Sequence, residues 1–165
     1  MKIKPLITGI LIAILFITTT ACSENVAVVK PSIGYVPDGW LLKEDIPYGE
    51  YTSNSGKVYY SNAAGDCGVM IYYGDIPGSL KGKENDEVAL IDAAVEEAVL
   101  FEPEATGTMT VNGRIAGYAE GVFMGLPEIF IVFVDGSTHI SIMAGYVTAQ
   151  DETNAMALID SIYFQ

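Results

Sequence analysis

The segment that decides the fold runs from Thr106 to Val122 and has the sequence TGTMTVNGRIAGYAEGV. Two strand-like runs flank Asn112-Gly113, a pair that favours a two-residue hairpin turn because both residues tolerate positive φ. After it, the run from Ile129 to Val134, IFIVFV, is apolar at every position. A strand that is buried on both faces has this pattern. These two stretches together predict a meander whose inner strand, Ile129 to Val134, is covered on two sides.

Further strands are indicated on both sides of this meander. Residues 57–61 and 69–73 are rich in Val, Ile and Tyr and are separated by turn-forming residues, so they predict a hairpin. A Gly125-Leu126-Pro127 turn leads into the apolar run, and residues 139–146 form the last strand of the meander. Leu41, Leu42 and Ile46 indicate an irregular first strand.

Two segments have helical patterns. Between Asp86 and Phe101 the apolar residues recur at helical spacing, and the main stripe consists of Val88, Ile91, Val95, Ala98 and Val99. A second stripe of Leu90, Ala94 and Phe101 indicates a helix that is covered on more than one side. Thr148 and Asp151 resemble a capping box, which predicts a closing helix over residues 149–163. Helices that follow runs of hairpin-linked strands favour the α+β class, with an antiparallel sheet and helices packed on its faces.

The N-terminal residues 1–21 are typical of an export signal, with Lys2 and Lys4 before an apolar run. Small residues then end at Cys22, as in a lipoprotein signal, although Thr19 stands where such signals usually have Leu. We expect cleavage before Cys22 and a lipid on its thiol. Cleavage without a lipid is one alternative, and an uncleaved anchor is another because residues 5–23 are uncharged. Each alternative places the folded part outside the cytoplasm.

The remaining chain predicts one domain. We expect a tether over residues 22–34 and a single domain over residues 35–165. The sequence has 8 Lys and Arg against 21 Asp and Glu, a net charge of −13. Nucleic acid phosphates and anionic lipid surfaces would repel such a chain, so neither is expected as a partner.

A family resemblance rests on the two ends of this domain and on its order of elements. The domain opens with Pro37-Asp38-Gly39-Trp40 and ends with an apolar motif over residues 158–164. Together with the order hairpin, helix, meander and helix, these motifs resemble the PsbP/Mog1-like family, here as a prokaryotic lipoprotein member. The resemblance implies an α/β/α sandwich and mostly non-enzymatic roles, among them an extrinsic photosystem subunit and a binder of a small GTPase. None of the contact positions of those proteins is carried over to this chain.

Residues with catalytic chemistry are sparse. His139 is the only histidine and lies on a predicted strand, where it is either a base for a nearby serine or a hydrogen-bonded rim residue. Cys67 has no nearby cysteine or histidine in sequence, so we interpret it as a half-buried structural residue. Asp92 and Glu96 share a helix face and are weak candidates for a divalent cation, the alternative being a solvated acidic face. No cofactor is predicted.

Aromatic residues form the better candidate site, because tyrosine is amphipathic and common at recognition surfaces. One residue of each adjacent pair is expected to be exposed, since neighbours on a strand face opposite sides. Ordinary strand-forming tyrosines are the alternative. The candidate contact residues are Trp40, Tyr48, Tyr51, Tyr59, Tyr60, Tyr72 and Tyr73.

These observations lead to two functional hypotheses. The first is a lipid-anchored extracytoplasmic binding or assembly module, without catalysis, that docks onto a cell-envelope protein carrying basic groups. The alternative is an extracytoplasmic hydrolase that uses carboxylates or His139.

Overall fold

The computed structural model describes residues 27–165. Along the chain its elements are β1 (Ser32–Ile33), β2 (Trp40–Ile46), β3 (Ser55–Asn62), β4 (Gly68–Asp75), α1 (Glu87–Glu97), β5 (Ala105–Val111), β6 (Arg114–Phe123), β7 (Leu126–Asp135), β8 (Thr138–Gly145), α2 (Ala149–Asp160) and β9 (Ile162–Tyr163). Neither described helix is long and apolar enough to cross a bilayer. The signal peptide predicted over residues 1–21 and the lipid site Cys22 lie outside the described residues.

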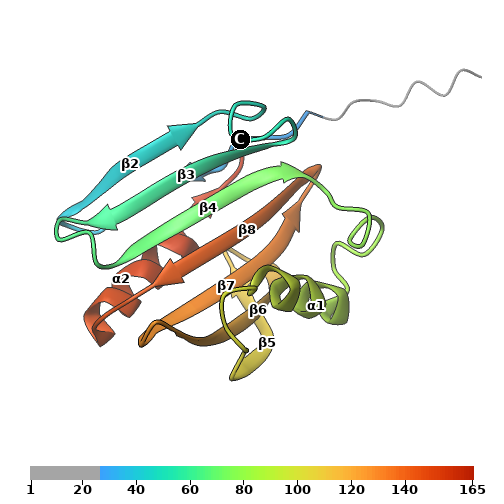
Figure 1. Ribbon diagram of the computed structural model, residues 1–165. Coiled ribbons are helices and arrows are strands. Elements are labelled where there is room, and N and C mark those ends of the chain that lie inside the picture. Colours follow the sequence, from blue (N-terminus) through green and yellow to red (C-terminus); the bar gives the residue numbers. More distant parts are fainter. Residues whose placement is uncertain (1–26) are drawn as a thin grey trace, which may run out of the picture.

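One antiparallel sheet of seven strands dominates the domain, in the order β2-β3-β4-β8-β7-β6-β5. The two helices lie on opposite sides of this sheet (Figure 1). The expected α+β fold, an antiparallel sheet with helices packed on its faces, is therefore confirmed.

The apolar run from Ile129 to Val134 is an inner strand, as predicted. It lies in β7, between β6 and β8, and all six of its residues are buried. Ile131 and Phe133 pack into the core under α2, whereas Val132 and Val134 pack under α1. Because alternate side chains face opposite helices, every position of the run is apolar.

Helix α1 is shorter than predicted and faces the sheet with a different side. Asp86 caps it by accepting hydrogen bonds from two backbone N–H groups, but it ends at Glu97 rather than at Phe101. The valines of the main predicted stripe point outward, with Val88 66% and Val99 81% exposed, although Ala98 of that stripe is buried. The buried residues of the helix are Leu90, Ala93 and Ala94, two of which belong to the second predicted stripe. The alanines allow close approach to the sheet. A Cβ atom placed on Gly117 of β6 would lie 2.2 Å from the Leu90 carbonyl.

The turns of the meander and the irregularity of β2 can be compared directly with the sequence predictions. Asn112 and Gly113 both have positive φ, so the predicted hairpin turn is confirmed. The turn predicted over residues 125–127 is instead formed by Met124 and Gly125, which also have positive φ, and β7 begins directly after them. Irregularity in β2 is confirmed by a shift of its pairing with β3 between Leu42 and Glu44.

The two ends of the described chain pack together. The capping box of Thr148 and Asp151 is confirmed, but α2 ends at Asp160 because β9 pairs with β1. Residues 27–34, which we expected in a tether, thus lie on the domain. The backbone N–H of Val29 donates a hydrogen bond of 2.8 Å to the buried Thr138 hydroxyl. The folded domain therefore begins before residue 35.

Candidate functional site

Helix α1 covers only one half of its side of the sheet. It packs on β5, β6 and β7, and the neighbouring strands β3, β4 and β8 carry no helix on that side (Figure 1). The strand register places one set of side chains on this uncovered half, which we call the open face. Its residues are Lys57, Tyr59, Met70, Tyr72, His139, Ser141 and Met143.

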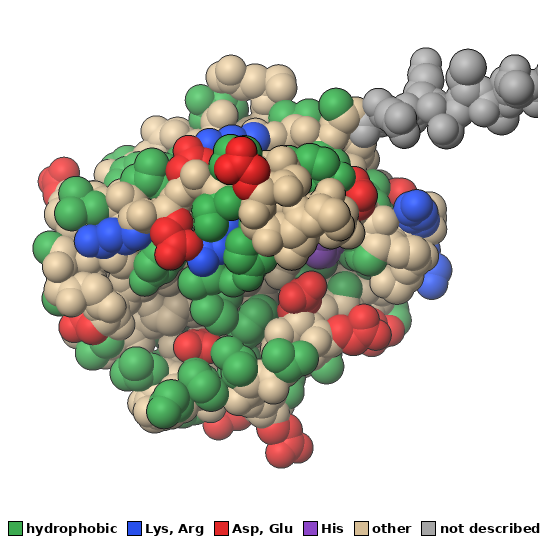
Figure 2. Space-filling model, turned by 45° about the horizontal axis from the view of Figure 1, so that its top comes forward, with side chains coloured by type: hydrophobic (Ala, Val, Ile, Leu, Met, Phe, Trp, Pro, Cys, Tyr) green, Lys and Arg blue, Asp and Glu red, His purple; other side chains and the backbone are tan. Residues whose placement is uncertain are grey.

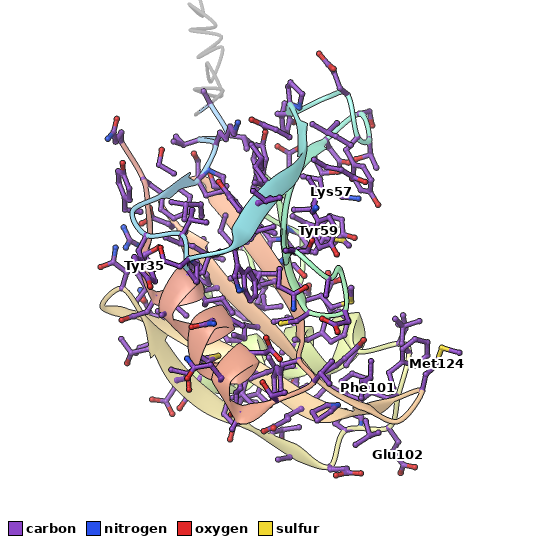
Figure 3. The ribbon with its side chains drawn as sticks, turned by 90° about the vertical axis from the view of Figure 1, so that its left-hand side faces the viewer. Tyr35, Lys57, Tyr59, Phe101, Glu102 and Met124 are labelled. Carbon is purple, nitrogen blue, oxygen red and sulfur yellow. The ribbon has the colours of Figure 1, made fainter. Side chains whose placement is uncertain are left out.

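Three of the predicted tyrosines lie on or beside the open face. Tyr59 and Tyr72 belong to it, and Tyr51 reaches it from the connection between β2 and β3. The ring centroids of Tyr51 and Tyr72 are 5.4 Å apart, and the Lys57 ammonium lies 5.5 Å from the Tyr51 centroid. Figure 3 shows Lys57 and Tyr59 projecting to the same side of the sheet as Phe101 and Met124. Burial, helped by the Tyr51 hydroxyl, raises the pKa of Tyr72 to about 12.

The other candidate aromatic residues lie elsewhere. Trp40 and Tyr73 are only 5% and 2% exposed and belong to the core under α2, so their side chains offer little surface to a partner. Tyr60 is half-buried against the same core. Tyr48 is exposed near the open face and donates a hydrogen bond of 3.0 Å to Asp75. The sheet thus divides the tyrosine-rich segment between its two sides.

A hollow of about 520 Å³ occupies one end of the open face. Tyr51 and Tyr72 form one wall, and Val99 and Leu100, just beyond α1, form another. Figure 2 shows this side of the molecule, where hydrophobic side chains gather around a recess and the purple of the single histidine is visible. Ligand-binding pockets in proteins commonly have this size and apolar lining.

His139 lines this hollow together with Ser141, Glu97 and Asp75. Burial lowers the pKa of His139 to about 4, so its imidazole is neutral at neutral pH and only a weak base. Within residues 27–165 no serine or carboxylate hydrogen-bonds to this ring. Burial raises the pKa of Glu97, and the Ser141 hydroxyl opposes that rise. The hollow brings the groups together without the ordered nucleophile, base and acid of a triad.

A second hollow, of about 160 Å³, lies at the other end of the open face. Tyr59, Met70 and Met143 line it together with Glu128 of β7 and Asp66 of the β3–β4 turn. Sequence reasoning missed Glu128. The available signal was an acidic residue directly before a fully apolar inner strand, a position where a charged side chain must lie close to the core.

The remaining sequence candidates do not combine into a site. Cys67 is buried, and burial raises the pKa of its thiol to about 12, with Asp151 and Asp66 adding to the effect. Asp92 and Glu96 are exposed on α1. In the described part of the chain, no three His, Cys, Asp or Glu side chains are grouped so that they could hold a metal ion.

Comparisons with known proteins extend to the fold and no further. No family model matches the sequence, and a search of curated proteins found no match. Among solved structures, a protein from Bacteroides thetaiotaomicron VPI-5482 aligns with a TM-score of 0.55 at 12% identity, covering 82% of this chain and 45% of its own. The likeness is one of fold. This chain spans less than half the length of that protein.

A second structural neighbour is the cyanobacterial PsbP (CyanoP) from Synechocystis sp. PCC 6803. It aligns with a TM-score of 0.49 at 11% identity, covering 86% of this chain and 96% of its own. The antiparallel α+β architecture itself is established by the strands and helices described above. Membership of the PsbP/Mog1-like family, and of its lipoproteins, stays a prediction.

Proposed function

We propose that this chain is a non-catalytic binding module that docks a basic segment of a cell-envelope protein onto its open face. The observation that carries the proposal is the uncovered half of the sheet, where aromatic and methionine side chains surround two hollows. Exposed apolar surface rimmed by polar groups is typical of interaction sites. Tyrosine and methionine are also enriched in the cores of protein interfaces.

Charge supports a basic partner. The whole chain carries −13, and Glu44, Asp75, Glu97 and Glu128 all lie on or beside the open face. Lys57 is already paired with Glu44 at 2.5 Å, so the net charge around the open face stays negative. Opposite charge speeds the encounter of two proteins and disfavours acidic competitors.

Attachment to a membrane is the second part of the proposal. Cys22 lies only five positions before the first described residue, Ala27, and residues 27–34 pack on the domain. A lipid on Cys22 would therefore hold the domain close to the membrane surface. The partner protein would then have to lie at or near that surface. A chain of five residues reaches at most about 18 Å.

The hydrolase alternative rests on one specific observation, the presence of His139, Ser141 and Glu97 in the larger hollow. The weak basicity of His139 and the absence of a hydrogen bond that orients it, within the described residues, favour binding over catalysis. A test must therefore report on both functions.

Site-specific photocrosslinking in intact cells tests the docking surface. A photoreactive phenylalanine derivative replaces Tyr51, which is 43% exposed, or Tyr59 on the open face. The matched control carries the same group in place of Val88, on the outer side of α1. We expect one crosslinked protein from both tyrosine positions, identified by mass spectrometry, that is absent from the control and weakened by high salt.

Two outcomes would overturn the proposal. One is crosslinking of the same protein with equal yield from Val88, which would mean that contact is not specific to the open face. The other is a hydrolytic activity of the purified chain that is lost in both His139→Ala and Ser141→Ala while crosslinking is unaffected by Tyr72→Ala. That result would assign the larger hollow to catalysis.

A further inference from the structure

Glu128 keeps a carboxylate oxygen that nothing in the described domain uses. Oε2 of Glu128 is buried and has no hydrogen-bond partner, and it is the one such side-chain atom among residues 27–165. None of the ion pairs found within the described residues involves it. Burial raises the pKa of this carboxyl group. The residue as a whole is half-buried, but leaving one of its oxygens buried without a partner has a cost that a suitable ligand could remove.

Glycines surround Glu128 in the sheet. It pairs with Gly121 on β6 and with Gly145 on β8, and Gly145 pairs in turn with Gly68 on β4. The side chains that would normally cover a residue on an inner strand are therefore missing on both sides.

Aromatic rings cover the two outer glycines, and the Glu128 side chain itself lies over the middle one. A Cβ atom placed on Gly121 would lie 2.5 Å from the ring of Phe101, and one on Gly68 would lie 2.6 Å from the ring of Tyr59. A Cβ atom on Gly145 would meet only Glu128, at 3.6 Å. Tyr59 and Phe101 come from different parts of the chain and lie on the same side of the sheet (Figure 3). The Glu128 side chain, with its Oε1, therefore lies over Gly145 and lines the smaller hollow together with Tyr59.

The lining of this space selects a particular ligand chemistry. Met70, Met143 and Leu126 provide apolar walls, Tyr59 provides a ring, and Glu128 and Asp66 provide negative charge. An anion would be repelled, and a neutral apolar group would leave the Glu128 oxygen unpaired. A group with an aliphatic stem and a cationic head satisfies both the walls and the carboxylate. Its cation can also lie against the tyrosine ring.

We propose that the hollow beside Glu128 binds the side-chain cation of a lysine or arginine of the partner protein. This inference rests on the proposed docking function and names the chemistry that the partner must present. About 160 Å³ is sufficient for one such side chain and too small for a folded element. The partner segment would then lie across the open face with one basic residue inserted beside Gly145.

Small basic amides test the site directly. The purified full chain in detergent micelles is labelled with ¹⁵N, and the backbone amides of Gly68 and Gly145 are followed by NMR. The probes are N-acetyl-lysine methylamide, N-acetyl-arginine methylamide and the uncharged N-acetyl-norleucine methylamide. We expect saturable shifts of both glycines with at least one basic probe, and none with norleucine. Norleucine-induced shifts of equal size, or no shift with either basic probe, would overturn the inference.

Two variants distinguish the contribution of the Glu128 charge to binding from that of the shape of the hollow. Glu128→Gln removes the charge and keeps the shape, and we expect it to weaken binding about tenfold or more. Gly145→Val places a side chain against Glu128 and narrows the hollow while the carboxylate remains, and it should abolish the shift at Gly68. Glu87→Gln, at the exposed start of α1, is the matched control and should bind as the unchanged chain does. Thermal unfolding of each variant shows whether it is folded, and full binding by a folded Glu128→Gln would also contradict the site.

The two proposals fail in different ways. If crosslinking from Tyr51 and Tyr59 persists unchanged in Glu128→Gln while the amides do not bind, docking stands and the basic-residue hollow is wrong. If the basic amides bind through Glu128 but no protein is crosslinked from the open face, the hollow exists and the docking function is wrong.

Discussion

The protonation of His139 offers the sharpest test of the larger hollow, because this is the only imidazole in the chain. Burial lowers its pKa from 6.5 to about 4. The unfolded chain therefore binds this proton near pH 6.5, whereas the folded domain does not bind it until about pH 4. Its contribution to stability is fully present above pH 6.5 and is lost as the pH falls towards 4. Linkage gives a loss of about 2 kcal/mol by pH 5 and about 3 kcal/mol by pH 4.

The measurement compares the original chain with His139→Gln, which cannot titrate in this range. Urea unfolding at pH 8 and at pH 5 gives the free energy of unfolding for each protein. Other carboxylates of the hollow, Glu97 and Asp75, are present in both and largely cancel in the difference. We expect the original chain to lose about 2 kcal/mol more than the variant. An NMR titration of the imidazole should have its midpoint near pH 4, and a midpoint near 6.5 would show that the ring is solvated and the reasoning wrong.

Three further predictions concern packing, reactivity and the N-terminus. Gly117→Ala should lower the free energy of unfolding by about 3 kcal/mol or prevent folding, since its Cβ would lie 2.2 Å from the Leu90 carbonyl. In the same urea assay, Gly78→Ala should change the free energy of unfolding little, because open space surrounds Gly78. Iodoacetamide should modify Cys67 slowly in the folded chain and quickly in urea, because burial raises its thiol pKa to about 12; equal rates would contradict this. The membrane-extracted protein should begin at Cys22 with a lipid by intact mass, and Cys22→Ala should release it; retention of residues 1–21 would refute cleavage.

The parts of the fold that the sequence predicts are those set by neighbouring residues. Positive φ at Asn112 and Gly113 needs only those two residues, and the capping box at Thr148 needs only Asp151. The side of α1 that faces the sheet is different. It depends on close contact with Gly117 of β6. Periodicity within the helix indicated two apolar stripes but could not show that the sheet covers the one with Leu90 and Ala94 rather than the valines.

In the candidate site, too, local features could be predicted from the sequence and long-range arrangements could not. Strand alternation correctly indicated that Tyr59 and Tyr60 face opposite sides, but it could not say which side a helix covers. The hollow beside Glu128 requires Gly121, Gly145 and Gly68 to lie in one row across four strands. That row depends on the pairing of β4 with β8, strands separated by α1 and the rest of the meander, and no local pattern specifies it.

The position of α1 and the presence of the open face have a common physical cause. A helix approaches a sheet closely where the strands carry small residues, and on this side Gly117 and Ala119 of β6 provide that surface. On β3 and β4 the corresponding positions hold Tyr59 and Tyr72, whose rings would keep a helix backbone several ångströms further away. The side chains that exclude α1 from this half are therefore Tyr59 and Tyr72, which stay half-exposed on the open face. Replacing them by alanine would remove the binding surface and extend the surface on which a helix can pack, so the open face is specified by the residues that we expect to bind.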